Sequence, residues 1–273
     1  MKVEDLTIEE RLRLICGKDS WHTDDLNGKI SFVKVTDASM GVRMCEEDGN
    51  GDKPSVSYPS SQMLANTWDS ETVRAYAECV ANDCLDYGAD ILLGPGVNIK
   101  RNPLCGRNFE YYSEDPYLAG IIAREFISAM QQEGAGTCLK HFCANNLEYN
   151  RMLQSTDADE RTLREIYYKP FDIACEAKPV SVMCSYNKSM ACRARRTKRA
   201  LRCCATISVS TVLSFPIGAR CSTEQRRRKR AWIWKCRSYP SITSSWLPTT
   251  AQAKLPKRKL TFAPRGCWSL FPV

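Results

Sequence analysis

The chain has 273 residues, of which 43% are hydrophobic and 26% charged, as is ordinary for a soluble globular protein. No window reaches 18 consecutive apolar residues, and the first six residues form neither a basic nor an apolar segment, so we expect no membrane span, no signal peptide and a cytoplasmic location. The net charge of +8 averages two unlike parts, because residues 1–188 hold 20 Lys and Arg against 30 Asp and Glu, whereas residues 189–273 hold 19 against one.

The first predicted helix begins near residue 8. Thr7 and Glu10 have capping-box spacing, in which each side chain accepts a hydrogen bond from the other residue's backbone N–H, and Gly17 follows the last turn. A short strand is predicted at residues 33–35. This strand leads directly into a loop that begins with Asp37.

Two longer helices follow, with a strand between them. Asp69 is the predicted N-cap of a helix that ends at residue 87, and Pro116 suits the first turn of a helix that ends at residue 133. Residues 89–97 form an apolar run that predicts a buried strand. The face that the first of these helices should bury holds Val73, Ala77, Val80 and Cys84.

The last strand–helix–strand unit spans residues 136–187. Apolar runs end at Phe142 and at Asn187, and the helix between them, residues 157–177, should bury Leu163, Ile166, Phe171 and Ala174. Strands and helices thus alternate about every 45 residues, which is typical of consecutive βα units in a parallel sheet. We count four strands, where a complete (β/α)8 barrel has eight.

Five sequence motifs carry a family resemblance. They occupy residues 37–43, 101–115, 140–142, 159–165 and 182–187, and the last three form an ordered set within about 50 residues. Together they resemble the N-terminal barrel domain of glycoside hydrolase family 3, of the β-glucosidase type. The resemblance implies an α/β fold of the TIM-barrel type, of which residues 1–188 would be the N-terminal half.

The resemblance also implies a sugar site at the carboxyl ends of the strands. Asp37 would grip hydroxyls of the terminal sugar, Arg107 would face the sugar, and a cis peptide between Lys140 and His141 would turn both side chains toward it. Asp37 would accept hydrogen bonds, whereas Arg107, Lys140 and His141 would donate them. Tyr186 would line the pocket edge. From the residues alone, the favoured interpretation is that Asp37 and Arg107 form loop salt bridges and that 140–141 is a plain strand end.

Two catalytic groups of the family are missing. Its nucleophile is an aspartate about 30 residues after the Tyr-Asn pair at 186–187, but no aspartate occurs after Asp172. Its acid/base is usually a glutamate of a following domain, which the chain does not reach. The intact relative would hydrolyse terminal non-reducing β-D-glucosyl residues with retention, and we expect this chain to be inactive. Ala38 and Ser39 also replace the family's usual Gly-Pro.

Residues 189–273 lose the helix and strand patterns. Arginine clusters at 193–202 and 226–230, near Trp232 and Trp234, would suit a nucleic-acid-binding tail. A one-base slip of the reading frame explains them better. The tail is then an out-of-frame product without structure, and its basic charge is an accident of a GC-rich gene.

Codon junctions support the slip. If each original codon is the last base of one visible codon and the first two of the next, the junction of Met190 and Ala191 must encode Gly. With permitted third bases, residues 206–221 read Asp-Asp-Phe-Gly-Phe-Asp-Gly-Phe-Val-Ile-Ser-Asp-Trp-Gly-Ala-Val. That message contains the family's Ser-Asp-Trp-Gly nucleophile segment, and the aspartate codon would straddle Pro216 and Ile217.

The remaining composition argues against a metal. The 15 cysteines include no C-x-x-C pair and there are only two histidines, so we expect buried thiols and neither zinc nor another cofactor. The expected partner is a small β-glucoside or oligosaccharide, without nucleic acid or membrane. The alternatives are a catalytically dead sugar-binding remnant and a nucleic-acid-binding protein.

Overall fold

The computed structural model describes residues 5–38, 40–43, 54–151, 153–189 and 192–193. The domain assigned to residues 1–188 lies largely within these ranges. The proposed out-of-frame tail lies outside them, apart from three residues at its start. No helix in the described part of the chain is long and apolar enough to cross a bilayer.

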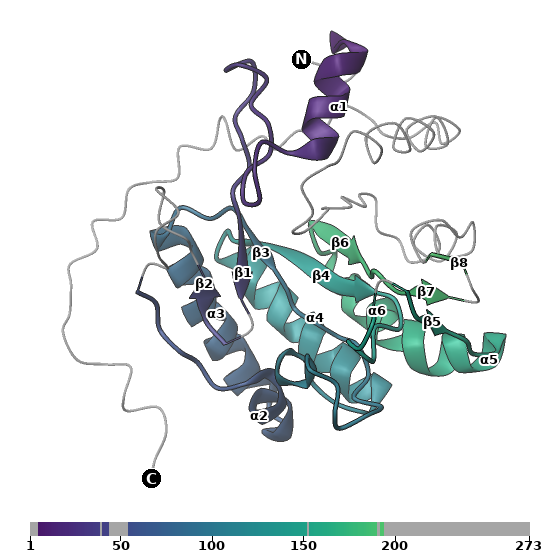
Figure 1. Ribbon diagram of the computed structural model, residues 1–273. Helices are drawn as coiled ribbons and strands as arrows, with labels where there is room; N and C mark the ends of the chain where they lie inside the picture. The colour runs from purple at the N-terminus through teal and green to yellow at the C-terminus, as the bar shows by residue number, and fades with distance from the viewer. Residues whose placement is uncertain (1–4, 39, 44–53, 152, 190–191, 194–273) are drawn as a thin grey trace, which may run out of the picture.

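Four parallel strands form the centre of the fold. They are β1 (Val35–Ala38), β3 (Ile91–Leu93), β4 (Gly136–Phe142) and β6 (Ser181–Cys184), and they lie side by side in chain order (Figure 1). The short strand β2 (Val42–Arg43) pairs antiparallel with β1 at the edge of the sheet. The expected count of four βα-type strands is therefore confirmed, as is the α/β fold.

Three strand boundaries differ from the predicted ones, and one of them is the end of β6, which lies at Cys184 rather than at Asn187. The first strand begins at Val35, because the backbone of Val33 exchanges hydrogen bonds with Thr23 in the preceding loop. The strand predicted at 89–97 is limited to Ile91–Leu93, since Pro95 has no N–H with which to extend the ladder.

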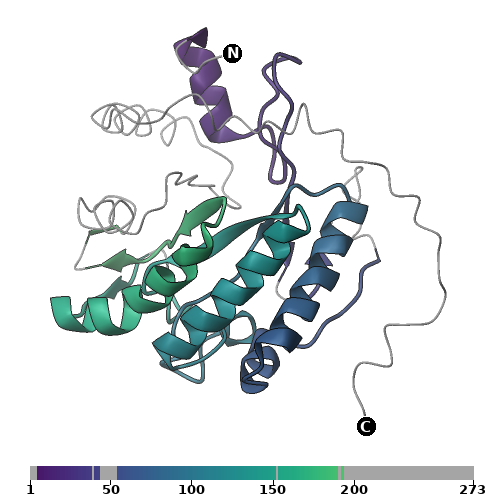
Figure 2. The ribbon, with the colours of Figure 1, turned by 180° about the vertical axis from the view of Figure 1, so that it is seen from behind.

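Three helices cover one face of the sheet. Helices α3 (Ser70–Asp86), α4 (Pro116–Gln132) and α6 (Lys169–Ala174) pack side by side in that order (Figure 2). Asp69 and Asp115 cap α3 and α4 by accepting backbone N–H groups, which compensates the unpaired donors of the first turn. The short helix α2 (Ser61–Asn66) precedes α3, and α1 (Ile8–Cys16) begins with the predicted capping box.

The helical segment before β6 is irregular. It runs from α5 (Glu160–Thr162) through a π-helix at Leu163–Tyr168 into α6, and it ends in a 3₁₀ turn at Cys175–Ala177. The expectation that Ile166 faces the core is wrong, since this side chain is 37% exposed while Tyr167 and Tyr168 are buried. A π-turn contains more residues than an α-turn, so it rotates different side chains inward.

The strands divide the buried apolar side chains between two faces. Leu92, Leu139 and Val182 pack toward the helices, whereas alternating residues of the same strands form a second cluster on the other face. This second cluster consists of Val35, Ile91, Leu93, Cys138 and Met183. Asp37 follows Val35 by two residues and Lys140 follows Cys138 by two. Strand alternation therefore directs both polar side chains to the face opposite the helices.

A second sheet combines one strand that precedes β6 in the chain with two strands that follow it. It contains β5 (Ser155–Thr156), β7 (Lys188–Ser189) and β8 (Cys192–Arg193), in that order. Five cysteines of the described residues are buried, as expected for small apolar side chains. Burial raises the pKa of the Cys84 thiol to about 12, which keeps it protonated.

Candidate functional site

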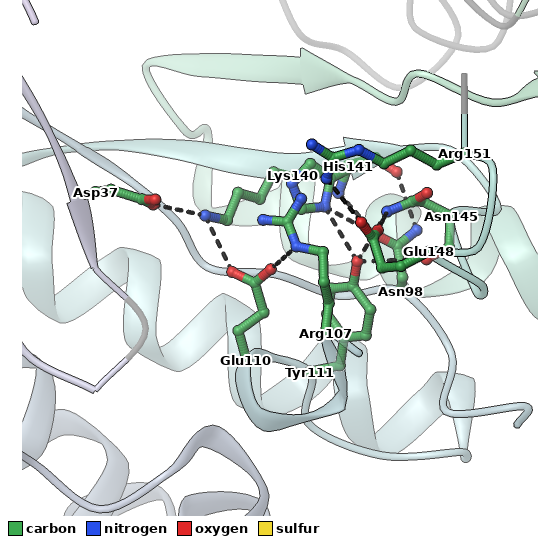
Figure 3. Close-up of polar contacts among 10 residues, drawn as sticks. All are labelled: Asp37, Asn98, Arg107, Glu110, Tyr111, Lys140, His141, Asn145, Glu148 and Arg151. Carbon is green, nitrogen blue, oxygen red and sulfur yellow. Dashed lines mark hydrogen bonds and ion pairs between the residues drawn. The ribbon is translucent and has the colours of Figure 1, made fainter. Parts of the chain in front are cut away.

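A group of charged side chains lies at the carboxyl ends of the strands. Asp37 comes from the end of β1, Lys140 from the end of β4, and Arg107 and Glu110 from the segment that follows β3 (Figure 3). Lys140 Nζ is 2.9 Å from Asp37 Oδ1 and 3.1 Å from Glu110 Oε2. Arg107 Nε donates to the other carboxylate oxygen of Glu110. Glu110 thus links the two cations.

This charged group is unequally exposed. The side chains of Lys140 and Glu110 are 1% and 3% exposed, whereas that of Asp37 is 41% exposed. Burial alone would lower the pKa of Lys140, but the carboxylates of Glu110 and Asp37 outweigh burial and raise it. The pKa of Arg107 is likewise raised, because Glu110 overcomes the effect of burial. Both side chains therefore stay cationic and can donate hydrogen bonds.

His141 belongs to a neighbouring neutral network. Its peptide bond with Lys140 is cis, as the resemblance implied, and Phe142-Cys143 is also cis. The backbone N–H of His141 donates to Asn98 Oδ1 at 3.0 Å, and Asn98 Nδ2 donates to the His141 carbonyl at 3.0 Å. Nδ1 of the ring lies 3.2 Å from Asn98 Oδ1 and 3.3 Å from the Tyr111 hydroxyl.

The ionisation of His141 is suppressed. Burial, followed by the charges of Arg107, Lys140 and Arg151, holds the pKa of this imidazole well below its usual range. Burial also raises the pKa of the Tyr111 hydroxyl, so that it stays protonated. At neutral pH both groups are neutral hydrogen-bonding partners beside the charged group.

A further chain of contacts connects Tyr111 to Tyr186. Asn145 donates through Nδ2 to the Tyr111 hydroxyl at 3.1 Å and to Glu148 Oε1 at 2.8 Å. Glu148 pairs with Arg151 at 2.7 Å, and the guanidinium of Arg151 lies 5.1 Å from the ring centroid of Tyr186. Tyr186 is therefore close to the site but reaches the other predicted residues only through intermediates.

The structure brings together four of the five residues predicted for the site. Asp37 and Lys140 are in direct contact, Arg107 joins them through Glu110, and His141 is adjacent to Lys140. Sequence reasoning missed Asn98 and Tyr111 as members of the site, and it included Glu110 only as part of the motif at residues 101–115. Their positions near strand ends were the available signal, since polar residues converge there in parallel sheets.

The arrangement suits a ligand rich in hydroxyl groups. Asp37 offers partly exposed acceptors, and the two cations offer charged donors whose positions are fixed by a buried carboxylate. A sugar hydroxyl both donates and accepts, so such a mixed set can bind it. The described residues contain no group of three or more His, Cys, Asp or Glu side chains placed to bind a metal ion.

Comparison with known proteins gives consistent matches. Residues 23–203 match the Glycosyl hydrolase family 3 N terminal domain. Thermostable beta-glucosidase B of Acetivibrio thermocellus is 46% identical over 193 residues, which is 68% of this chain and 26% of that protein. An exo-alpha-(1->6)-L-arabinopyranosidase of Bifidobacterium longum is 42% identical over 194 residues, with the same coverage of both chains.

Solved structures agree with the sequence matches. Beta-glucosidase 3B of Thermotoga neapolitana, in complex with glucose, superposes with a TM-score of 0.68 at 37% identity, covering 73% of this chain and 31% of that one. Beta-glucosidase of Kluyveromyces marxianus, also with glucose, gives a TM-score of 0.69 at 35% identity, covering 72% and 24%. The chain spans about a quarter of the length of the curated relatives it matches.

Proposed function

The chain belongs to glycosyl hydrolase family 3, and from this premise we propose that it carries the sugar-binding half of a β-glucosidase-type active site without the catalytic nucleophile. The observation that carries the proposal is the group of Asp37, Arg107, Glu110 and Lys140 at the carboxyl ends of the strands. Its acceptors and fixed charged donors match the needs of a pyranose ring. The solved relatives that contain glucose support the same ligand class.

The roles of the site residues follow from their contacts. Asp37, which is partly exposed, accepts hydrogen bonds from sugar hydroxyls, while Lys140 and Arg107 donate to hydroxyl oxygens. Glu110 holds both cations in place. Tyr186, beside Arg151, borders the site on the side of β6.

The chain as it stands does not turn over substrate. A retaining glycosidase needs a carboxylate nucleophile on one face of the sugar. No aspartate follows Asp172, and the codon-junction reading places the lost aspartate between Pro216 and Ile217. We propose that residues 189–273 are an out-of-frame product. The reversal of charge at residue 189 supports this interpretation.

Resequencing the gene across codon 188 tests the proposal. A one-base correction should restore the Ser-Asp-Trp-Gly segment, and the repaired enzyme should hydrolyse aryl β-D-glucosides with retention of configuration. The unrepaired chain should show no turnover. An unrepaired chain that hydrolyses the substrate and loses that activity on Asp37→Ala would overturn the inactive-chain proposal.

The same assay should compare two sugars. Two relatives of similar identity are named for β-glucosides and for an L-arabinopyranoside, so the shared region does not by itself fix the sugar. We propose the β-D-glucoside, and aryl β-D-glucopyranoside and aryl α-L-arabinopyranoside should be measured side by side. A higher kcat/KM for the arabinopyranoside would contradict this choice while leaving the pyranose site intact.

If resequencing confirms the present bases and the protein is expressed, a different conclusion is favoured. The chain would then be a sugar-binding remnant that has lost hydrolysis. The third alternative, a nucleic-acid-binding protein, depends on basic clusters that the frame slip explains as accidental. This alternative would be favoured if the chain binds nucleic acid in the presence of glucose at a 1:1 ratio to the nucleic acid, and if the binding is lost on deleting residues 189–273.

A further inference from the structure

The orientation of the Asn98 side chain is fixed by the backbone of His141. The His141 N–H needs an acceptor and the His141 carbonyl needs a donor, and Asn98 supplies both at 3.0 Å. A flipped amide would set its NH2 group against the N–H and its oxygen against the carbonyl. Both contacts would then be repulsive, so the oxygen of Asn98 must face His141 N.

The fixed amide in turn determines which ring nitrogen of His141 carries the proton. The same Asn98 oxygen lies 3.2 Å from Nδ1, and an amide oxygen can only accept. Nδ1 must therefore be protonated. The Tyr111 hydroxyl, 3.3 Å from Nδ1, is compatible with this assignment, because it can donate to the Asn145 carbonyl at 3.3 Å while its oxygen accepts from Nδ1–H.

The other ring nitrogen then bears a lone pair. His141 is buried and surrounded by the cations Arg107, Lys140 and Arg151, which disfavour a second proton on the ring. Among the described residues, Nδ1 has hydrogen-bond partners whereas Nε2 has none. The polar atoms of this network are shown in Figure 3.

We propose that Asn98 is a positioning residue that locks His141 in the neutral Nδ1–H tautomer, so that Nε2 accepts a hydrogen bond from a hydroxyl of the bound sugar. The acceptor role rests on the proposed sugar-binding function, whereas the tautomer does not. The inference reverses the expectation from sequence, in which His141 was a donor. A sugar hydroxyl that donates its hydrogen to Nε2 can still accept hydrogen bonds from Lys140 or Arg107. His141 would then supply an acceptor where these two cations supply donors.

Nitrogen-15 NMR of the full chain labelled at histidine tests the tautomer. The chain has only two histidines, and a His22→Gln variant assigns the signals of His141. Magic-angle-spinning spectra make the measurement independent of the association state. At neutral pH we expect a protonated Nδ1 and a bare Nε2. A ring protonated at Nε2, or at both nitrogens, would overturn the proposal.

Two substitutions test the role of Asn98 itself. Asn98→Asp keeps an acceptor for Nδ1–H and should retain the tautomer, whereas Asn98→Ala leaves only Tyr111, whose hydroxyl can donate or accept. A share of Nε2–H tautomer should therefore appear in Asn98→Ala. Asn66→Ala, at an exposed position in α2, is the matched control and should leave the spectrum unchanged. An unchanged tautomer in Asn98→Ala would show that Asn98 only supports the fold.

Titration with glucose tests the acceptor role and separates it from the proposed function. Calorimetry first shows whether glucose binds and whether Asp37→Ala abolishes the binding. On binding, the Nε2 signal should move to lower frequency while Nδ1 keeps its proton. Binding without this shift would overturn the acceptor role alone. Absence of binding would refute the proposed function and the acceptor role with it, and the tautomer would still be decided by the ligand-free spectrum.

Discussion

Replacing Lys140 by alanine in the repaired enzyme should lower kcat/KM for an aryl β-glucoside by roughly 10- to 150-fold. The ammonium group has three N–H donors, and two of them face Asp37 at 2.9 Å and Glu110 at 3.1 Å. The third remains for a sugar hydroxyl. Loss of one hydrogen bond to a charged group costs about 1.5 to 3 kcal/mol, which corresponds to this range of rate.

The same substitution also affects folding, and the two effects must be measured separately. Without Lys140, Glu110 stays buried with Arg107 as its remaining partner in this group. Removal of one member of a buried ion pair costs about 3 to 5 kcal/mol of stability. Thermal unfolding should therefore be recorded for each variant, and kcat/KM should be calculated per folded enzyme from active-site titration.

Two comparison variants complete the experiment. Lys18→Ala removes an exposed lysine and should leave kcat/KM unchanged. Glu110→Gln weakens the same ion pairs but keeps both cationic donors, so it should lower stability with a smaller loss of kcat/KM than Lys140→Ala. If Lys140→Ala and Lys18→Ala had equal kcat/KM per folded enzyme, the assignment of Lys140 as a sugar donor would be refuted.

Three further predictions concern the fold and its response to pH. Gly120→Ala should lower the free energy of unfolding of the repaired enzyme by about 1 to 3 kcal/mol, because the new Cβ would lie 2.8 Å from Cβ of Ile173. In the control Gly106→Ala the new Cβ has its nearest neighbour at 3.9 Å, so the free energy of unfolding should change little. Equal values for the two variants in denaturant titration would contradict the close packing of α4 on α6. The pKa of His141 is lowered in the fold, so the unfolded chain binds the additional proton, and stability should fall as pH drops below about 6.5, by up to about 1.4 kcal/mol per pH unit. His141→Gln should make that pH dependence shallower, and an unchanged slope would argue against a suppressed ionisation. The unrepaired chain should associate, because four strands of an eight-stranded fold leave open sheet edges; a monomer in size-exclusion chromatography with a sharp thermal transition would contradict this.

Local sequence signals predicted most of the helices. The N-caps predicted at Thr7 and Asp69, the proline predicted in the first turn of α4 and the glycine predicted after α1 depend on a few adjacent residues, and the structure follows these signals. Strand β4 also has the predicted ends. These features could be predicted from the sequence because each is determined by residues close to one another along the chain.

Features that depend on distant contacts could not be predicted in this way. Val33 resembles a strand residue, but its backbone N–H and carbonyl both form hydrogen bonds with Thr23 instead of with a neighbouring strand. Asn98 resembles an ordinary loop asparagine until the backbone of His141 is placed beside it. The family resemblance supplied Asp37, Arg107 and Lys140 as site residues, whereas the importance of Glu110 required the distances between them.

The π-helix at Leu163–Tyr168 has a consequence for insertions and deletions in this family. A π-turn holds a residue more than an α-turn of similar length, so a relative shorter by one residue here could wind as an ordinary α-helix and leave Phe171 in its buried place. The change would remove or redirect Tyr167, whose hydroxyl accepts a hydrogen bond from Arg101 at 3.0 Å. Arg101 lies on the segment that leads to Arg107. Length variation at this helix would therefore loosen the connection between the helical layer and the loop that carries Arg107, without disturbing the core itself.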